Sequence, residues 1–272
     1  MPPSSSSRFT TVNDVRLHHL DHGGSGVPIV LIHGVLGHAH IWDATVDTLH
    51  DAGHVYALDL RGYGDSQWDP TSTYSTESHA ADIAAWMDKQ GLERAHIVGF
   101  SWGGLIGLRL ATLHPELVDR LALLDISPSS PLAETDLPPV PLSFDTHAAA
   151  MASERFVNRF ASPEVIDDMA AFSTRPGPEG KLVKKHDPIF AERWVFRSDD
   201  RWTELAQVTI PVLVVRAAEN GRLSPEDAQR MLATASAASL VEIADSGHLI
   251  PLDNPDALAV ALSAFVATEV MA

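Results

Sequence analysis

Six short apolar runs, separated by helix-like stretches, constrain the fold of this chain more than any other feature. Continuous apolar runs of four to seven residues are typical of strands that are buried on both faces of a sheet. Strands that alternate with helices predict parallel pairing through right-handed crossovers. We therefore expect an α/β fold, with a mostly parallel sheet covered by helices on both faces. The expected strands are residues 28–34, 54–59, 96–100, 121–126, 212–215 and 240–243, preceded by an antiparallel pair within 8–22, and the expected helices are residues 40–51, 76–90, 102–114, 225–234 and 254–268.

Residues 128–205 interrupt this alternation, because they contain a helical pattern but no convincing buried strand. We predict a helical cap at 128–205, inserted into a core made of residues 1–127 and 206–272. Eight of the eighteen aromatic residues of the chain lie in the cap. Such rings either join the cap to the core or line a substrate pocket. The candidates for the pocket are Trp194, Phe190 and Phe160.

Composition excludes several classes of function. The formal net charge of −17 argues against binding to nucleic acids and to anionic membranes. There is no cysteine, so disulfides, thiolate metal sites and a cysteine nucleophile are excluded. No apolar run approaches the ~18 residues of a membrane span, and the first residues lack the pattern of a signal peptide. We expect a cytoplasmic monomer or homodimer that acts on a small molecule without a cofactor.

The segment G-F-S-W-G-G (99–104) carries the strongest chemical signal. A predicted strand runs directly into Ser101, and a predicted helix follows it. A serine on such a sharp turn is held out at the carboxyl edge of the sheet, and the positive end of the helix lies beneath it. Upstream, a second strand ends at His33-Gly34, where the amide of Val35 could point at the same space. Together with the Trp102 amide it would bind a developing oxyanion.

A histidine in the loop after the last expected strand completes this picture. His248, in A-D-S-G-H-L-I-P-L-D-N-P, could accept the serine proton and return it to a leaving group. The pairs His18-His19 and His38 with His40 lack a nearby carboxylate cluster or a clear third ligand. We therefore expect exposed histidines there and no metal site.

Four motifs in this order resemble those of the α/β-hydrolase superfamily: H-G-V-L-G, D-L-R-G-Y-G-D-S (59–66), G-F-S-W-G-G and S-G-H-L-I-P-L-D-N-P. They span nearly the whole chain. The resemblance implies an eight-stranded, mostly parallel sheet with a cap after the sixth strand. It also implies that Ser101 is the nucleophile, His248 the base, and Val35 and Trp102 the oxyanion donors.

The catalytic acid is missing from the place where the resemblance puts it. Relatives often read R-G-x-x-S-D-x-L-S-P-E in the loop that begins at residue 216, and here Gly221 stands where the Asp belongs. Glu219 carries a charge but lies two residues early. Asp125 ends the strand that follows the nucleophile helix, and its tip neighbours the same loop. Some members, including zearalenone-type lactonases, place their acid at this earlier strand end. We favour Asp125, with Glu219 as the alternative, and the absence of any acid stays open.

These residues predict hydrolysis of a carboxylic ester or lactone through an acyl-enzyme. The aromatic cap favours an apolar or aryl substrate. Hydrolysis of a carbon–carbon bond in a diketone, or cofactor-free perhydrolysis, would use the same residues. The absence of the loop Asp also motivates an alternative of another class, a protein that binds a ligand without turnover.

Overall fold

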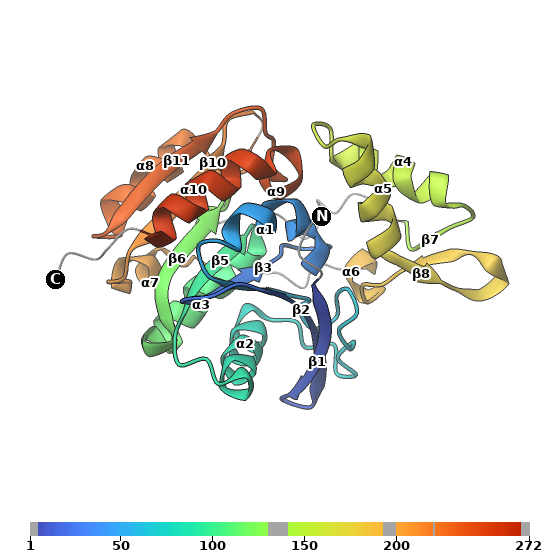
Figure 1. Ribbon diagram of the computed structural model, residues 1–272, viewed down its shortest axis with the longest axis horizontal. Helices are drawn as coiled ribbons and strands as arrows, with labels where there is room; N and C mark the ends of the chain where they lie inside the picture. The colour runs from blue at the N-terminus through green and yellow to red at the C-terminus, as the bar shows by residue number, and fades with distance from the viewer. Residues whose placement is uncertain (1–4, 130–140, 193–199, 220, 268–272) are drawn as a thin grey trace.

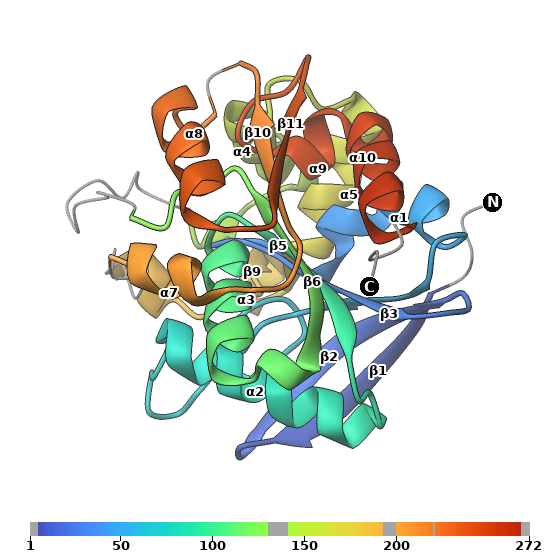
Figure 2. The same ribbon diagram turned by 90° about the vertical axis from the view of Figure 1, so that its left-hand side faces the viewer.

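An eight-stranded sheet, with strand order β1-β2-β4-β3-β5-β6-β10-β11, forms the centre of the computed structural model (Figures 1 and 2). The structure describes residues 5–129, 141–192, 200–219 and 221–267. Pairing is antiparallel between β1 and β2 and between β2 and β4, and parallel between all later neighbours. The α/β fold with a mostly parallel sheet is therefore confirmed. The strands are β1 (Ser6–Val12), β2 (Val15–Gly23), β3 (Pro28–Ile32), β4 (His54–Leu58), β5 (Ala95–Phe100), β6 (Val118–Leu124), β10 (Val212–Ala217) and β11 (Ala238–Ile243).

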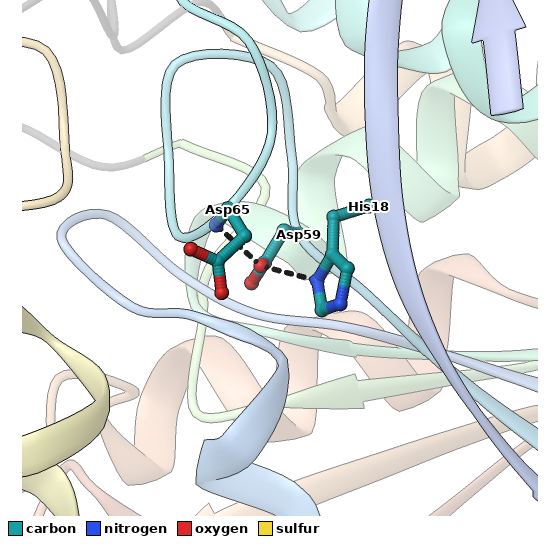
Figure 3. A group of neighbouring side chains, drawn as sticks. All are labelled: His18, Asp59 and Asp65. Atoms are coloured by element: carbon teal, nitrogen blue, oxygen red, sulfur yellow. Dashed lines mark hydrogen bonds and ion pairs between the residues drawn. The ribbon is translucent and has the colours of Figure 1, made fainter. Parts of the chain in front are cut away.

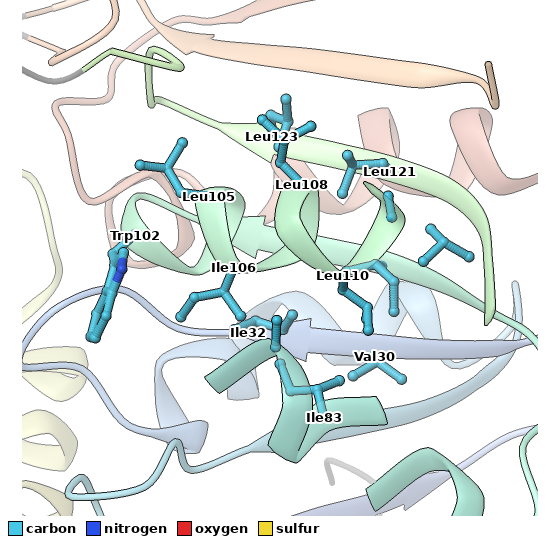
Figure 4. Packing of buried hydrophobic residues seen from close by; sticks show 14 of the residues in the cluster. Val30, Ile32, Ile83, Trp102, Leu105, Ile106, Leu108, Leu110, Leu121 and Leu123 are labelled. Carbon is cyan, nitrogen blue, oxygen red and sulfur yellow. The ribbon is translucent and has the colours of Figure 1, made fainter. Parts of the chain in front are cut away.

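Alternate side chains of the central strands enter two separate hydrophobic cores. Along β3, Val30 and Ile32 belong to one core, while Ile29 and Leu31 belong to the other. Successive side chains of a strand point to opposite faces, so a strand covered on both sides is apolar at every position. Figure 4 shows the first core, in which Val30 and Ile32 lie beside Ile83 and residues of the helix that follows β5. Two-sided burial thus explains the continuous apolar runs in the sequence.

The helices that cover the sheet lie close to their predicted bounds. Ser75 and Ser224 each cap a helix by accepting a hydrogen bond from the backbone amide three residues later. Within the described residues, no helix is long and apolar enough to cross a membrane. One face carries α2 (Thr76–Gln90), α3 (Trp102–Leu113) and α8 (Pro225–Thr234), and the other carries α1 (Asp43–Leu49) and α10 (Pro255–Ala267). Shorter helices are η1 (Ala39–Trp42), η2 (Pro115–Leu117) and α9 (Ile250–Asp253).

Between β6 and β10 the chain leaves the main sheet. The elements from β7 to α6 form a group beside the sheet at the right of Figure 1, whereas α7 lies apart from this group and packs on α3 and α8. The predicted helices are present, but the segment also contains a three-stranded antiparallel sheet, β7-β9-β8, which we did not predict. Strands of two or three residues are too short to show a periodicity. The elements are β7 (Ser143–Phe144), α4 (His147–Val157), α5 (Pro163–Phe172), β8 (Thr174–Pro176), η3 (Pro178–Gly180), β9 (Leu182–Lys184), α6 (Ile189–Glu192) and α7 (Trp202–Gln207).

Candidate active site

Ser101 lies in the one-residue turn between β5 and α3, with a strained backbone. Its φ of 53° and ψ of −123° fall in a region that residues with a side chain rarely adopt, at a cost of about 1–3 kcal/mol. The turn is so tight that a Cβ on Gly99 would lie 2.3 Å from the Gly103 carbonyl oxygen, and one on Gly103 would lie 2.3 Å from that of Ile32. Glycine at both positions therefore permits the turn that exposes the Ser101 hydroxyl.

Asp125 stands at the equivalent place on the next strand. The register pairs Leu124 with Phe100 on one side and with Val215 on the other. Ser101 and Asp125 each follow a paired residue, so both lie at the carboxyl edge of the sheet. Asp125 also has a left-handed backbone, with φ of 49°, and its amide donates to the Val215 carbonyl at 2.7 Å.

The His248 ring connects these two side chains. Its Nδ1 lies 2.7 Å from Oδ2 of Asp125, and its Nε2 lies 3.2 Å from Oγ of Ser101. A carboxylate only accepts hydrogen bonds, so Nδ1 carries the proton and Nε2 is free to accept one from the serine. Burial lowers the pKa of His248 below 6.5, although the bond to Asp125 opposes that shift. The imidazole is therefore neutral near pH 7, as a general base must be.

The Asp125 carboxylate is fully buried and is stabilised by backbone amides as well as by His248. Oδ2 accepts a hydrogen bond from the Arg222 amide at 2.7 Å. Oδ1 accepts from the amides of Ala217 at 3.2 Å and Leu223 at 3.4 Å. Bonds to an ionised acceptor are stronger than neutral ones, and they offset part of the cost of burying the charge.

Gly221 lies against this carboxylate. A Cβ at that position would be 2.5 Å from Oδ1 of Asp125 and 3.0 Å from the Ala217 Cβ. The loop residue that replaces the expected Asp thus has no room for a side chain while Asp125 is present. Asn220 lies outside the described residues.

Glu219, the alternative acid, has another partner. Its Oε2 accepts the Ser246 amide at 2.7 Å, and its own amide donates to the Ser246 carbonyl at 3.0 Å. Glu219 therefore holds the loop that carries His248, whereas the carboxylate on the ring is that of Asp125. This supporting role was missed in the sequence, where only the charge of Glu219 drew attention.

The loop after β3 passes next to Ser101. A Cβ on Gly34 would lie 2.9 Å from the Ser101 Cβ, so the candidate donor Val35 follows a residue in contact with Ser101, the candidate nucleophile. His33 fixes this turn: its Nδ1 donates to the Gly34 carbonyl at 2.7 Å, and its Nε2 accepts the Leu60 amide at 3.1 Å. Burial lowers the pKa of His33 and keeps the ring neutral, as both bonds require. Trp102, which carries the second candidate amide, is the first residue of α3.

The three aromatic pocket candidates have different surroundings. Phe190 is buried, and its ring stacks on Tyr63 with centroids 4.3 Å apart, so it joins the inserted segment to the core. Phe160 is 47% exposed. Its Cε2 lies 3.5 Å from where a Cβ of Gly247, the neighbour of His248, would be. Trp194 lies outside the described residues.

The expectation of exposed histidines was wrong for His18, His19 and His38, which are all buried. Burial lowers the pKa of His19 to about 4 and that of His38 to about 3, so both rings are neutral. Single histidines fill interior space more readily than other ionisable residues, because the neutral imidazole carries no charge to desolvate. Sequence position alone did not reveal this.

One group of side chains, His18 with Asp59 and Asp65, has ligand-type atoms within 4.8 Å of one another (Figure 3). Asp59 Oδ2 already accepts from His18 Nδ1 at 2.7 Å and from the Asp65 amide at 2.8 Å, and Oδ1 accepts from the Ala39 amide at 2.6 Å. The Asp65 carboxylate binds Lys185 Nζ at 2.8 Å. These hydrogen bonds satisfy the group as a structural network that fixes the loop after β4, and a metal ion would have to displace them.

Comparison with known proteins agrees with this geometry. The family model described as the alpha/beta hydrolase fold matches residues 27–255. N-formylmaleamate deformylase of Pseudomonas putida is 27% identical over 263 residues, which cover 94% of each chain. An esterase of Mycobacterium tuberculosis is 27% identical over 251 residues, or 87% of this chain and 81% of the esterase.

Solved structures with the same fold match almost the entire chain. E-2-(acetamidomethylene)succinate hydrolase has a TM-score of 0.85 at 20% identity, covering 97% of this chain and 100% of that one. The crystal structure of the mycobacterial esterase has a TM-score of 0.82 at 23% identity, covering 98% and 92%. At such identities the likeness establishes the fold.

Proposed function

Because the chain belongs to the α/β-hydrolase family, we propose that it is a serine hydrolase that cleaves a carboxylic ester or lactone through an acyl-enzyme. The observation that carries the proposal is the chain of contacts from Asp125 through His248 to the Ser101 hydroxyl. The similarity to an esterase over most of both chains supports it. The core would comprise residues 1–127 and 206–272, and the cap residues 128–205.

In this mechanism Ser101 Oγ attacks the carbonyl carbon while its proton passes to His248 Nε2. The carbonyl oxygen becomes an oxyanion, which the amides of Val35 and Trp102 would bind. Collapse of the intermediate breaks the ester bond, and the leaving alkoxide takes the proton from His248. Water then repeats the sequence against the acyl-enzyme, releases the acid and restores Ser101. Buried Asp125 stabilises the imidazolium that forms in each half-reaction.

The substrate would place an apolar acyl or aryl group beside Phe160. This ring is exposed and lies against the loop that carries His248. An apolar group that covers it would remove both surfaces from water. The formal charge of −17 favours neutral substrates over anionic ones, because the surface repels anions.

A second candidate is hydrolysis of an N-acyl bond in a small molecule. It is favoured by the match to N-formylmaleamate deformylase, which covers 94% of both chains. The same nucleophile and base would serve: the formyl C–N bond breaks, and the nitrogen of the leaving amide takes the proton from His248.

The test is a panel of aryl esters, macrolactones of graded size, N-formyl amides and diketones, together with labelling by a fluorophosphonate. We expect covalent labelling of Ser101 and turnover of esters or lactones, both abolished in Ser101→Ala. Faster cleavage of N-formyl amides would establish the second candidate. Rapid diketone cleavage without esterase activity would indicate a carbon–carbon hydrolase, and an unreactive Ser101 would favour a binding protein.

A further inference from the structure

The side chain of Trp102 is held by a helix other than its own. Trp102 is the first residue of α3, and Figure 4 shows its indole at the start of that helix. The indole Nε1 donates a hydrogen bond to Oγ1 of Thr76 at 3.0 Å, and Thr76 is the first residue of α2. Both side chains are buried. A directional contact therefore joins the start of α3 to the start of α2.

The first turn of α2 is itself well fixed. Ser75 caps the helix by accepting the Ser78 amide at 3.0 Å. His79 Nδ1 donates to the Ser75 carbonyl at 2.7 Å, and the same ring meets the Trp102 indole in a T-shaped contact with centroids 4.6 Å apart. Burial lowers the pKa of His79 to about 3, so this ring is neutral. One turn of α2 thus supplies both a hydrogen-bond acceptor and an aromatic contact to the indole.

The residue held in this way is next to the candidate nucleophile. Ser101 has a φ of 53°, and such a strained backbone persists only where its surroundings hold it. On the side of the sheet, α3 packs closely, since a Cβ on Gly103 would lie 2.3 Å from the Ile32 carbonyl oxygen. On the side of α2, the hydrogen bond from the indole fixes a direction, which apolar packing alone does not.

We propose that Thr76 is a positioning residue for the oxyanion site: by accepting the indole N–H, it fixes the start of α3 and so the direction of the Trp102 amide beside Ser101. The inference rests on the proposed function, because this amide binds an oxyanion only if Ser101 attacks a carbonyl. The oxyanion forms in the transition state and is absent from the bound substrate. Displacement of its donor therefore lowers kcat and leaves KM almost unchanged.

The key variants are Thr76→Val, which has a similar shape but no acceptor, and Thr76→Ser, which keeps the hydroxyl group. We expect Thr76→Val to lower kcat for a short aryl ester about tenfold, less than the ~10²–10³ for loss of a whole donor, with KM within about twofold. Thr76→Ser should stay within about threefold of the parent. The control is Thr45→Val, at a buried threonine of α1 whose Oγ1 has no hydrogen-bond partner among the described residues. It should leave kcat unchanged.

Trp102→Phe removes the donor of the same hydrogen bond but keeps an aromatic ring and the backbone amide. In that background, Thr76→Val should lower kcat by less than about twofold, because the bond is already absent. An equal loss in both backgrounds would overturn the inference, since the effect would not pass through the indole. If Thr76→Val does not fold, Trp102→Phe tests the bond from the donor side, and an unchanged kcat there would contradict the inference.

An inhibitor that mimics the transition state should report the same displacement. Phenylboronic acid forms a tetrahedral adduct with a serine hydroxyl, and one of its oxygens would occupy the oxyanion site. We expect its inhibition constant to rise about tenfold in Thr76→Val and to change by less than about threefold in Thr76→Ser. An unchanged constant in Thr76→Val would show that Thr76 does not act on the oxyanion site.

Hydrogen exchange of the Trp102 indole N–H, followed by NMR on the resting protein, separates failure of this inference from failure of the proposed function. The resonance is identified by its loss in Trp102→Phe. We expect exchange at least about tenfold faster in Thr76→Val than in the parent or Thr76→Ser. Equal exchange in all three proteins, or equal kcat in the two Thr76 variants, would overturn the inference. A parent protein that neither hydrolyses esters nor reacts with a fluorophosphonate would refute the proposed function, while the exchange result would still decide whether Thr76 holds the indole.

Discussion

The ends of β6 and β10 are neighbours at one edge of the sheet, yet they serve the site differently. At the end of β6, Asp125 is fully buried and contacts the His248 ring. Beyond the end of β10, Glu219 accepts the Ser246 amide in the loop that carries His248. Gly221 has no side chain, and the Asp125 carboxylate occupies the space where one would lie. The fold therefore offers two places from which an acid could reach one imidazole, and in this chain only the first is filled.

The two places exclude each other for steric reasons. A Cβ at residue 221 would approach Asp125 Oδ1 to 2.5 Å, which real Cβ atoms essentially never do. A glycine at the position where the resemblance puts an Asp is thus what an acid on β6 requires. The two strand ends therefore have to be considered together: the Asp that is missing at residue 221 leaves room for the carboxylate of Asp125.

The largest effect is expected at the filled position. Asp125→Asn should lower kcat by about 10³–10⁴, because an amide no longer stabilises the imidazolium and favours the wrong tautomer of His248. The measurement is turnover of one short aryl ester, with Asp88→Asn, at an exposed position of α2, as the control. Near-normal turnover would mean that the two strand ends do not differ as we infer.

A side chain at residue 221 should also lower kcat, but by less than the loss of the Asp125 charge. Gly221→Ala pushes a methyl group against the Asp125 carboxylate and should lower kcat by about 10- to 100-fold through displacement of the acid. The control is the same change in an Asp125→Gly background. There the methyl group meets only Ala217, 3.0 Å from its Cβ, and should lower kcat much less. A cycle of the two single variants and the double variant, measured by ester turnover, gives the coupling.

Moving the acid would test the comparison directly. Asp125 has a φ of 49°, which glycine adopts without strain, so Asp125→Gly leaves the backbone intact. Adding Gly221→Asp to that variant should recover at least about tenfold in kcat, since a carboxylate again lies near His248 Nδ1. Recovery by Gly221→Asn to the same level would show that charge is not what matters.

The effect at Glu219 should be smaller. Glu219→Gln keeps an oxygen that accepts the Ser246 amide, and we expect a change in kcat of less than about threefold. Glu219→Ala leaves that amide without its acceptor and should lower kcat about tenfold, because the loop that carries His248 becomes less well fixed. A loss in Glu219→Gln as large as that in Asp125→Asn would instead identify Glu219 as the acid.

The smallest effect is a shift in pH dependence. Burial lowers the pKa of His248 below 6.5, and the rate needs the neutral ring. The plot of kcat/KM against pH should therefore fall on the acid side with a midpoint below 6.5, as the ring becomes protonated. A midpoint above 6.5 would show that the interaction with Asp125 outweighs burial.

Much of the fold could be predicted because its signals are local. A few consecutive residues are enough to recognise the apolar strands β3 and β5. The same holds for helices α2 and α8, each of which begins with a serine cap. The small sheet β7-β9-β8 could not be predicted, because strands of two or three residues carry no periodicity and depend on distant partners.

The residues of the candidate site also divide into those that could be predicted from the sequence and those that could not. Ser101 stands out because its turn needs the neighbouring glycines, and Asp125 follows from the order of strands in the sheet. The supporting role of Glu219 was not predictable, since a carboxylate that binds a backbone amide leaves no pattern in the sequence. The burial of His18 and His38 depends likewise on contacts between segments far apart in the chain.

An acid at the end of β6 also has a consequence for how the chain is divided. Ser101 and Asp125 both precede the insertion, and His248 follows it. A polypeptide cut within the insertion would give one fragment with the proposed nucleophile and its proposed acid, and another with only the imidazole. Each fragment alone would be inert, so ester turnover after mixing would report directly on reassembly.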